Sequence, residues 1–320
     1  MSTATATDPL LQIRGLSVGF PTRAGTVMAV DDVNLSIGKR ETFGLIGETG
    51  SGKSVLGMAV MRLLPNSARI GGAIMLEGID ILTLDPEATR RLRGGSIGLV
   101  PQNPGSSLNP VLRVGTQIGE AVRLHRGVSG REAGQVVHDL LDRMGLPEPE
   151  KTARQYPFQL SGGMRQRVLT AIGIAGQPAL LIADEPTKGL DAIIRGQVIE
   201  TLHKAARETK ASMLVITHDL QVAEQLCDRV GVMYAGKILE IQTAERLFSA
   251  PQHPYTKALL NATPRKGLVP LPGTAPGLFD RPPGCVFAPR CGLVEIACGE
   301  DQAMRGMNGG AQVRCRLHAG

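Results

Sequence analysis

The stretch that decides the fold is Gly47-Glu48-Thr49-Gly50-Ser51-Gly52-Lys53-Ser54, which matches the phosphate-binding P-loop pattern at every fixed position. It follows an apolar run at residues 43–46, typical of a buried strand, and precedes a helix predicted from about residue 52 to residue 64, before Pro65. Glycines let backbone N–H groups face phosphate oxygens, and a helix N-terminus adds positive partial charge. Lys53 would meet the β- and γ-phosphates, and the Ser54 hydroxyl suits Mg²⁺. The stretch therefore predicts a nucleotide site.

Outward from this loop, apolar runs and helical periods alternate along the chain. This alternation predicts an α/β domain with a mostly parallel sheet. Strands are expected at 11–46, 73–76, 96–100, 179–183, 211–216 and 229–234, and helices near 86–93, over the region 111–176, and at 191–208 and 219–226.

An apolar strand ending in two carboxylates, Leu180-Leu181-Ile182-Ala183-Asp184-Glu185, carries the second motif. The carboxyl end of a buried parallel strand lies at the crevice where ligands bind. Asp184 would hold Mg²⁺, and Glu185 would orient or deprotonate an attacking water. A merely solvated acidic strand end is the alternative.

The third motif is Leu160-Ser161-Gly162-Gly163-Met164-Arg165-Gln166-Arg167, in which Ser-Gly-Gly opens a helix. A helix N-terminus with glycines is a second anion-binding site, and it need not close on the same nucleotide as the P-loop. With this motif the sequence resembles the ATP-binding subunits of ABC transporters, whose signature motif reads Leu-Ser-Gly-Gly. A bare turn is the alternative for Ser-Gly-Gly alone.

The resemblance implies the fold of an ABC cassette in the P-loop NTPase class. Such a cassette has a RecA-like, mostly parallel sheet core, an antiparallel β subdomain and an α-helical subdomain, here at about 111–176. Residues 1–250 would form this ATP-binding domain, and residues 251–320 a Pro/Cys-rich extension of the oligopeptide-transporter type, since composition shifts sharply after about 250.

Further site residues follow from the same resemblance. Phe20 would stack on adenine, or else be a core aromatic at a strand end. Gln102 would touch Mg²⁺ and report the nucleotide state to membrane subunits, and His218 would contact the γ-phosphate. Asp191 matches the D-loop aspartate that bridges two subunits. Lys188 and Gly189 depart from the small or hydroxyl residues usual in the family.

The extension holds four of the five cysteines, and Cys227, the fifth, is expected to be a buried small hydrophobe. The stretches 253–260 and 284–291 resemble the tail of the dipeptide/oligopeptide importer ATPases (the peptide/nickel importer subfamily), and the resemblance implies a [4Fe–4S] cluster. The spacing fits none of the tight zinc patterns, although zinc is the main rival and free thiols the third reading. The four candidate ligands are Cys285, Cys291, Cys298 and Cys315.

The resemblance implies an ATPase (ATP + H₂O → ADP + phosphate) that powers peptide import. Two cassettes would pair head to tail, so that Ser161, Gly162 and Gly163 cover the nucleotide of the partner. Expected partners are a second, paralogous ATPase subunit, two transmembrane permeases and an extracytoplasmic substrate-binding protein. Importers of nickel, glutathione or opines have similar ATPases, and a non-transport ABC ATPase acting on DNA or ribosomes is the alternative from another class.

The overall composition of the chain is compatible with an ATPase subunit of an importer but does not by itself indicate one. The 320 residues carry a net charge of +6, but only 3% are aromatic and none is Trp, which weighs against a base-stacking nucleic-acid module. No apolar run approaches the roughly 18 residues of a membrane span, and the first residues do not read as a secretory signal. The chain is therefore expected to stay in the cytoplasm, and the resemblance implies a peripheral protein on the cytoplasmic face of the inner membrane.

Overall fold

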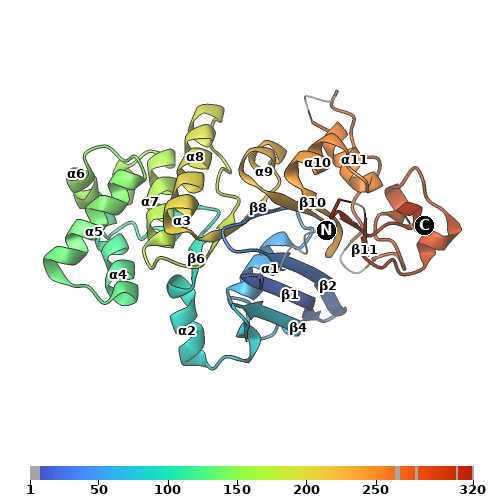
Figure 1. Cartoon of the computed structure of the whole chain (residues 1–320), viewed down its shortest axis with the longest axis horizontal. Helices are drawn as coiled ribbons and strands as arrows, with labels where there is room; N and C mark the ends of the chain where they lie inside the picture. The colour runs from blue at the N-terminus through green and yellow to red at the C-terminus, as the bar shows by residue number, and fades with distance from the viewer. Residues whose placement is uncertain (1–7, 264–266, 278–279, 308, 319–320) are drawn as a thin grey trace, which may run out of the picture. The chain divides into compact units, whose positions relative to one another are not determined.

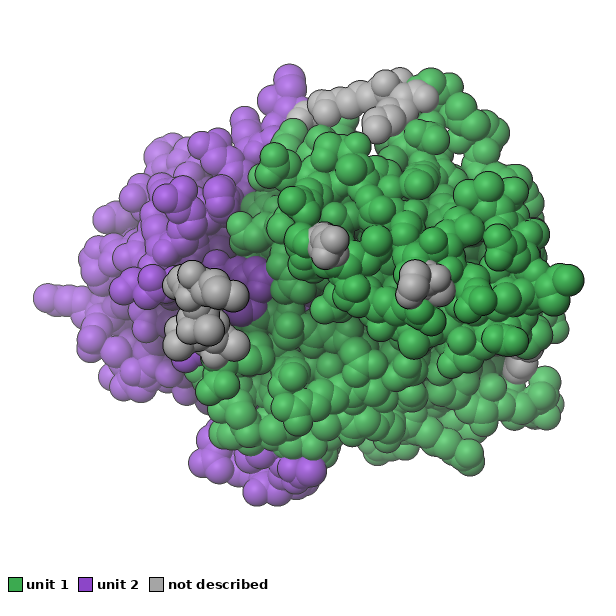
Figure 2. Space-filling model, turned by 45° about the vertical axis from the view of Figure 1, so that its right-hand side comes forward, with its two compact units in different colours: residues 1–37, 42–82, 216–320 green, residues 38–41, 83–215 purple. Residues whose placement is uncertain are grey.

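The computed structural model describes residues 8–263, 267–277, 280–307 and 309–318, and Figure 1 shows its helices and strands. The chain divides into two compact units, which Figure 2 colours separately. Unit 1 comprises residues 1–37, 42–82 and 216–320, and unit 2 comprises residues 38–41 and 83–215.

An antiparallel sheet with strand order β2-β1-β4-β5 forms one layer of unit 1. Along β1, buried Leu11, Ile13, Leu16 and Val18 are separated by more exposed residues, which is the pattern of a strand with one covered face. The register shifts between Arg14 and Ser17, where Gly15 has a φ of 56°. The strands are β1 Leu11–Thr22, β2 Gly25–Ile37, β4 Arg69–Leu76 and β5 Ile79–Asp80.

The other sheet strands of unit 1 follow the order β11-β12-β10-β9-β3. All five residues of β3 are buried, and each large apolar side chain there stabilises the fold by about 2 kcal/mol. β3 pairs in parallel with β9, whereas β9–β10, β10–β12 and β12–β11 are antiparallel. The bounds are β3 Thr42–Ile46, β9 Arg229–Tyr234, β10 Lys237–Thr243, β11 Arg305–Gly306 and β12 Gln312–Val313.

Helices of unit 1 follow these strands or lie in the C-terminal region. The α-helices are α1 Lys53–Val60, α9 Leu220–Leu226, α10 Ala244–Ser249 and α11 Pro254–Asn261. Short 3₁₀ turns of unit 1 lie at Ala288–Arg290, Ile296–Gly299 and Arg316–His318, and another, Ile81–Thr83, passes from unit 1 into unit 2 at residue 83.

Parallel strands and a group of helices make up unit 2. β6 Ile97–Val100 pairs in parallel with β7 Leu180–Asp184, and β8 Ser212–Thr217, which crosses the boundary between the units at residue 216, is next in order. A Cβ at Gly98 would collide with the carbonyl oxygen of Gly173, so glycine permits the close approach of α7 to β6. The helices are α2 Pro86–Gly95, α3 Pro104–Ser107, α4 Val114–Arg126, α5 Gly130–Arg143, α6 Pro149–Arg154, α7 Gly162–Ile174 and α8 Ala192–Thr209, with a 3₁₀ turn at Pro157–Gln159.

The predicted elements and the observed ones agree along most of the chain, but one helix end differs and several short elements were not predicted. Helix α1 ends at Val60, before Pro65 is reached, because Arg62 adopts a φ of 55° and its guanidinium donates to the carbonyl oxygens of Ile81 (2.6 Å) and Leu82 (3.1 Å). Strands β5, β10, β11 and β12 and helices α3, α10 and α11 were not predicted. The boundary near residue 250 stays a prediction, and the C-terminal region belongs to unit 1.

Within the described residues, no helix has both the length and the apolar character required to span a bilayer.

Candidate functional site

The P-loop of unit 1 joins β3 to α1 in a conformation that only glycine allows at two positions. Gly47 has a φ of 150° and Gly52 a φ of 105°. A Cβ at Gly47 would collide with the carbonyl oxygen of Met233, and a Cβ at Gly52 with that of Ala29. Glycine at these positions therefore lets the loop lie tightly against neighbouring backbone.

Lys53 lies buried inside this loop, with 6% of its surface exposed. Its Nζ donates to the carbonyl oxygens of Gly47 (2.8 Å) and Glu48 (2.9 Å) and to Oγ of Ser51 (3.3 Å). The N-terminus of α1 has no side-chain cap, because Gly52 occupies the cap position. A buried cation beside an uncapped helix N-terminus and a glycine-lined loop fits the phosphates of a nucleotide.

Two other predicted residues lie in unit 1. Phe20, on β1 opposite Val27, is half-buried, so part of its ring is open to a ligand. His218 is exposed and directly follows β8, and the next residue, Asp219, caps α9 by accepting from the N–H groups of Gln221 (3.0 Å) and Val222 (3.4 Å). The exposure of His218 leaves its ring accessible to a ligand.

The acidic strand end and Gln102 lie at one edge of the sheet in unit 2. Val100 pairs with Ala183 in the parallel register of β6 and β7, so the residues after each strand leave the sheet at the same end. Asp184 is half-buried, Glu185 is 8% exposed, and Gln102 is exposed. Glu185 has a φ of 47°, an uncommon conformation for a residue other than glycine and one found repeatedly at functional sites.

The Ser-Gly-Gly motif begins helix α7, as predicted. The Ser161 Oγ accepts from the N–H of Met164 (3.2 Å), which leaves the hydroxyl hydrogen to donate elsewhere. A Cβ at Gly163 would lie 2.6 Å from Cγ2 of Ile194, and one at Gly162 would lie 3.7 Å from Leu190. Glycine at position 163 therefore lets α7 approach the start of α8.

Asp191 is the N-cap of α8, and its Oδ1 accepts from the N–H groups of Ile193 (3.1 Å) and Ile194 (2.9 Å). The structure therefore brings the Ser-Gly-Gly motif and Asp191 together through Ile194. Capping was not predicted for Asp191, although aspartate before a helix is a recognised signal. Its predicted bridging role between subunits stays a prediction.

The four C-terminal cysteines gather in unit 1. Burial raises the pKa of Cys315, and the nearby thiols of Cys285, Cys291 and Cys298 raise it further. The N–H of Cys285 donates to the carbonyl oxygen of Cys298 (2.8 Å). Soft thiolates suit iron–sulfur clusters or zinc. However, among the described residues no group of three or more His, Cys, Asp or Glu side chains has the spacing of metal ligands.

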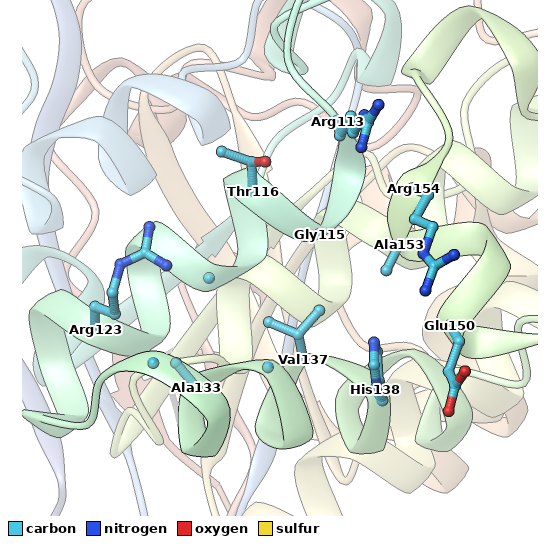
Figure 3. Close-up of a pocket in the computed structure, with 13 residues that line it drawn as sticks. Arg113, Gly115, Thr116, Arg123, Ala133, Val137, His138, Glu150, Ala153 and Arg154 are labelled. Carbon is cyan, nitrogen blue, oxygen red and sulfur yellow. The ribbon is translucent and has the colours of Figure 1, made fainter.

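A separate hollow lies among α4, α5 and α6 of unit 2 (Figure 3). It has a volume of about 330 Å³, and its charged lining comes from Arg113, Arg123, Arg154, His138 and Glu150. None of the predicted site residues lines it.

Sequence reasoning missed the side chains that surround Glu48 in the P-loop. Arg290 Nη1 lies 3.1 Å from both carboxylate oxygens of Glu48, and the hydroxyl of Tyr255 accepts from the Glu48 N–H at 3.1 Å. Both residues lie in the stretches that resemble the importer tail, but nothing in their spacing indicates contact with a loop about 200 residues earlier.

Comparison with protein families finds two matches in the chain. Residues 30–188 match the model described as ABC transporter. Residues 239–298 match the model described as oligopeptide/dipeptide transporter, C-terminal region.

Curated relatives match almost the whole chain. A protein of Brucella abortus (strain 2308), provisionally named a peptide import ATP-binding protein, is 43% identical over 98% of this chain and 97% of its own length. A protein of Brucella ovis with the same provisional name is 46% identical, over 91% of each chain.

Solved structures resemble the fold over about three quarters of the chain. A dimeric ATP-binding cassette in a post-hydrolysis state, bound to ADP and Pi, is similar with a TM-score of 0.65 and 26% identity, covering 73% of this chain and 98% of that one. A component of the cbiONQ transporter complex of Clostridium perfringens has a TM-score of 0.66 and 26% identity, covering 76% and 92%.

Proposed function

This chain belongs to the ABC transporter family as an ATP-hydrolysing subunit of a peptide importer, and we propose that it drives dipeptides or oligopeptides across the cytoplasmic membrane. The observation that carries the proposal is the buried Lys53 amine inside a glycine-lined loop at an uncapped helix N-terminus. The Lys53 amine is a buried cation, a group suited to a polyanion, and this loop bears the full P-loop pattern.

We assign the steps of hydrolysis to the predicted site residues. Lys53 binds the β- and γ-phosphates, Glu185 orients or deprotonates the attacking water, and His218 contacts the γ-phosphate. Phe20 stacks on adenine, and Gln102 carries the nucleotide state to the membrane subunits. Positioning and charge stabilisation dominate phosphoryl transfer, which is why no covalent intermediate is needed.

Ser54, Asp184 and Gln102 offer the oxygen ligands that Mg²⁺ prefers, and the ion would neutralise charge on the phosphate oxygens.

We also propose that the chain works in a head-to-tail pair with a second, paralogous ATPase subunit. The α7 N-terminus with Ser161, Gly162 and Gly163 completes the nucleotide site of the partner, and Asp191 bridges the two subunits. Lys188 and Gly189, which depart from the family pattern, would mark this asymmetric pairing.

The remaining partners in the proposal are two transmembrane permeases and an extracytoplasmic substrate-binding protein. The chain would lie on the cytoplasmic face of the inner membrane, with the ATP-binding domain at 1–250 and the extension at 251–320. The alternative cargoes are nickel, glutathione and opines, because importers of these substrates have closely similar ATPases.

Co-expression with the candidate membrane subunits tests the transport role. We expect ATPase activity to rise when permeases and a peptide-loaded binding protein are present, and to be insensitive to DNA or ribosomes. Stimulation by DNA or ribosomes, without any response to the membrane subunits, would instead place the chain among the non-transport ATPases.

For the four clustered cysteines we propose a [4Fe–4S] cluster, with zinc as the alternative. We expect the anaerobically purified chain to be brown and to contain iron and sulfide in equal amounts, and Cys298→Ser to remove both. Cys227→Ala is the matched control, because burial raises the pKa of that thiol to about 12 and it stands apart from the other four. Stoichiometric zinc without iron would contradict the cluster.

A further inference from the structure

Two residues of the C-terminal region (residues 251–320), Arg290 and Tyr255, form hydrogen bonds with the P-loop of unit 1. Arg290 lies in the 3₁₀ turn Ala288–Arg290, with only 6% of its side chain exposed. Its Nη1 donates to both carboxylate oxygens of Glu48 at 3.1 Å and to the hydroxyl of Tyr234 at 3.0 Å. Burial alone would lower the pKa of Arg290, but the bonds to Tyr234 and Glu48 outweigh it, so the charged form is favoured.

Tyr255 holds the backbone of the same residue. Its hydroxyl accepts from the N–H of Glu48 at 3.1 Å, and its ring is fully buried. Burial raises the pKa of Tyr255 above its ordinary value, so the hydroxyl stays neutral. Both polar groups of Glu48 that face the C-terminal region, the carboxylate and the N–H, are therefore bonded to it.

An aromatic cluster fixes these two residues in place. The ring of Tyr255 lies 4.5 Å from that of Tyr234 and 5.3 Å from that of Phe287, centroid to centroid. At the N-terminus of α11, His253 Nδ1 accepts from the N–H of Tyr255 at 3.0 Å. Burial lowers the pKa of His253 to about 3, which keeps the ring neutral and able to accept. Two of the three tyrosines of this aromatic-poor chain are used here.

On its other side, Glu48 faces the phosphate-binding lysine. The Glu48 carbonyl oxygen accepts from Lys53 Nζ at 2.9 Å and from the N–H of Ser51 at 3.2 Å. The contacts therefore run in series from Arg290 and Tyr255, through one residue, to Lys53. A change in the position of Glu48 would move a hydrogen-bond partner of the lysine.

We propose that Arg290 and Tyr255 are positioning residues for the P-loop, through which the C-terminal region sets the affinity of the chain for ATP. Held at its carboxylate and its N–H, Glu48 keeps its carbonyl oxygen where Lys53 is pre-oriented for phosphate. A loop fixed before the nucleotide arrives loses less conformational freedom on binding, and affinity rises accordingly. The inference rests on the assignment of this loop as the ATP site.

Two variants of the full chain test the proposal. Tyr255→Phe removes one hydroxyl and keeps the ring contacts, so it is expected to fold, and Arg290→Gln removes the charged partner of Glu48. We expect each to raise the Kd for MgATP, and the KM in the assembled transporter, about 5–30-fold, which corresponds to the loss of one or two hydrogen bonds. The kcat at saturating ATP should change less than about threefold, since Glu185 is untouched.

Arg314→Gln is the matched control. Arg314 is another buried arginine of the C-terminal region, and it pairs with Asp32 (3.3 Å) and bonds the carbonyl oxygens of Ile238 and Gln302, but not the P-loop. Its loss should lower the Tm and leave the Kd for MgATP unchanged. In addition, Glu48→Gln combined with Arg290→Gln should raise the Kd no further than either change alone, because both remove one contact.

The outcomes are distinct. Wild-type affinity in both Arg290→Gln and Tyr255→Phe would overturn the proposal, as would an equal loss of affinity in Arg314→Gln, which would indicate a general loss of structure. A wild-type chain that binds no MgATP would refute the assignment of the ATP site and the inference with it.

Discussion

Glu185→Gln is expected to stop ATP turnover while ATP still binds. Glu185 directly follows the buried strand β7, is 8% exposed, and has a φ of 47°. The position of its side chain is therefore fixed by the local backbone conformation. Glutamine keeps the size and an acceptor oxygen but cannot take a proton. A positioned general base contributes about 10²–10⁴-fold to rate, and we expect kcat to fall by that factor.

The measurement is the turnover of the assembled transporter, together with the Kd for MgATP of the variant chain. Glu200→Gln, an exposed carboxylate on α8, is the matched control and should leave both unchanged. Near-wild-type turnover in Glu185→Gln would show that Glu185 is not the general base. A large loss of ATP binding would show that Glu185 contributes to binding ATP before hydrolysis.

Lys53→Ala is expected to remove ATP binding itself. In the proposed site the buried amine would supply the charge that meets the phosphates, and hydrogen bonds to charged groups contribute about 1.5–3 kcal/mol each. Loss of one or more such bonds predicts a Kd for MgATP at least about 10–150-fold higher. ATP should therefore raise the Tm of the wild-type chain by mass action, and should leave that of Lys53→Ala nearly unchanged.

The same thermal scan without nucleotide separates binding from folding, because Lys53 also bonds the carbonyl oxygens of Gly47 and Glu48. Lys257→Ala, which removes an exposed lysine on α11, should behave as wild type. An unchanged ATP-induced rise in Tm for Lys53→Ala would contradict the role of this lysine.

Local patterns predicted the parts of the site that depend on short stretches of chain. The P-loop was expected between a buried strand and a helix, and β3 and α1 flank it. Likewise, an apolar run ending in two carboxylates predicted that Glu185 follows a parallel strand, whereas Gln102 was identified from the family resemblance. The register of Val100 with Ala183 brings the residues after both strands to one end of the sheet.

Contacts between residues far apart in the sequence could not be predicted from local sequence patterns. Glu48 and Arg290 are 242 residues apart, and neither hydropathy nor spacing indicates that they meet. The early end of α1 has the same origin, since Arg62 leaves the helix to bond the carbonyl oxygens of Ile81 and Leu82. In both cases tertiary contacts override a local pattern.

For the cysteines, the sequence predicted that the residues cluster but not the spacing of their side chains. Their clustering in sequence predicted that they gather, and they do, yet the structure does not hold three of them at ligand spacing among the described residues. Metal binding itself supplies much of the energy that draws thiolates into a closed site, so a chain without the metal need not present that spacing.

The central claim is that the Ser-Gly-Gly helix end of this chain covers a nucleotide held by the other ATPase subunit. The direct measurement is photolabelling of the assembled transporter with an ATP analogue that is reactive at the γ-phosphate, using a chain that carries Lys53→Ala and so holds no nucleotide of its own. The account predicts that peptides spanning residues 160–167 of this chain are labelled. Label on the P-loop of the other subunit, with none on residues 160–167, would contradict it.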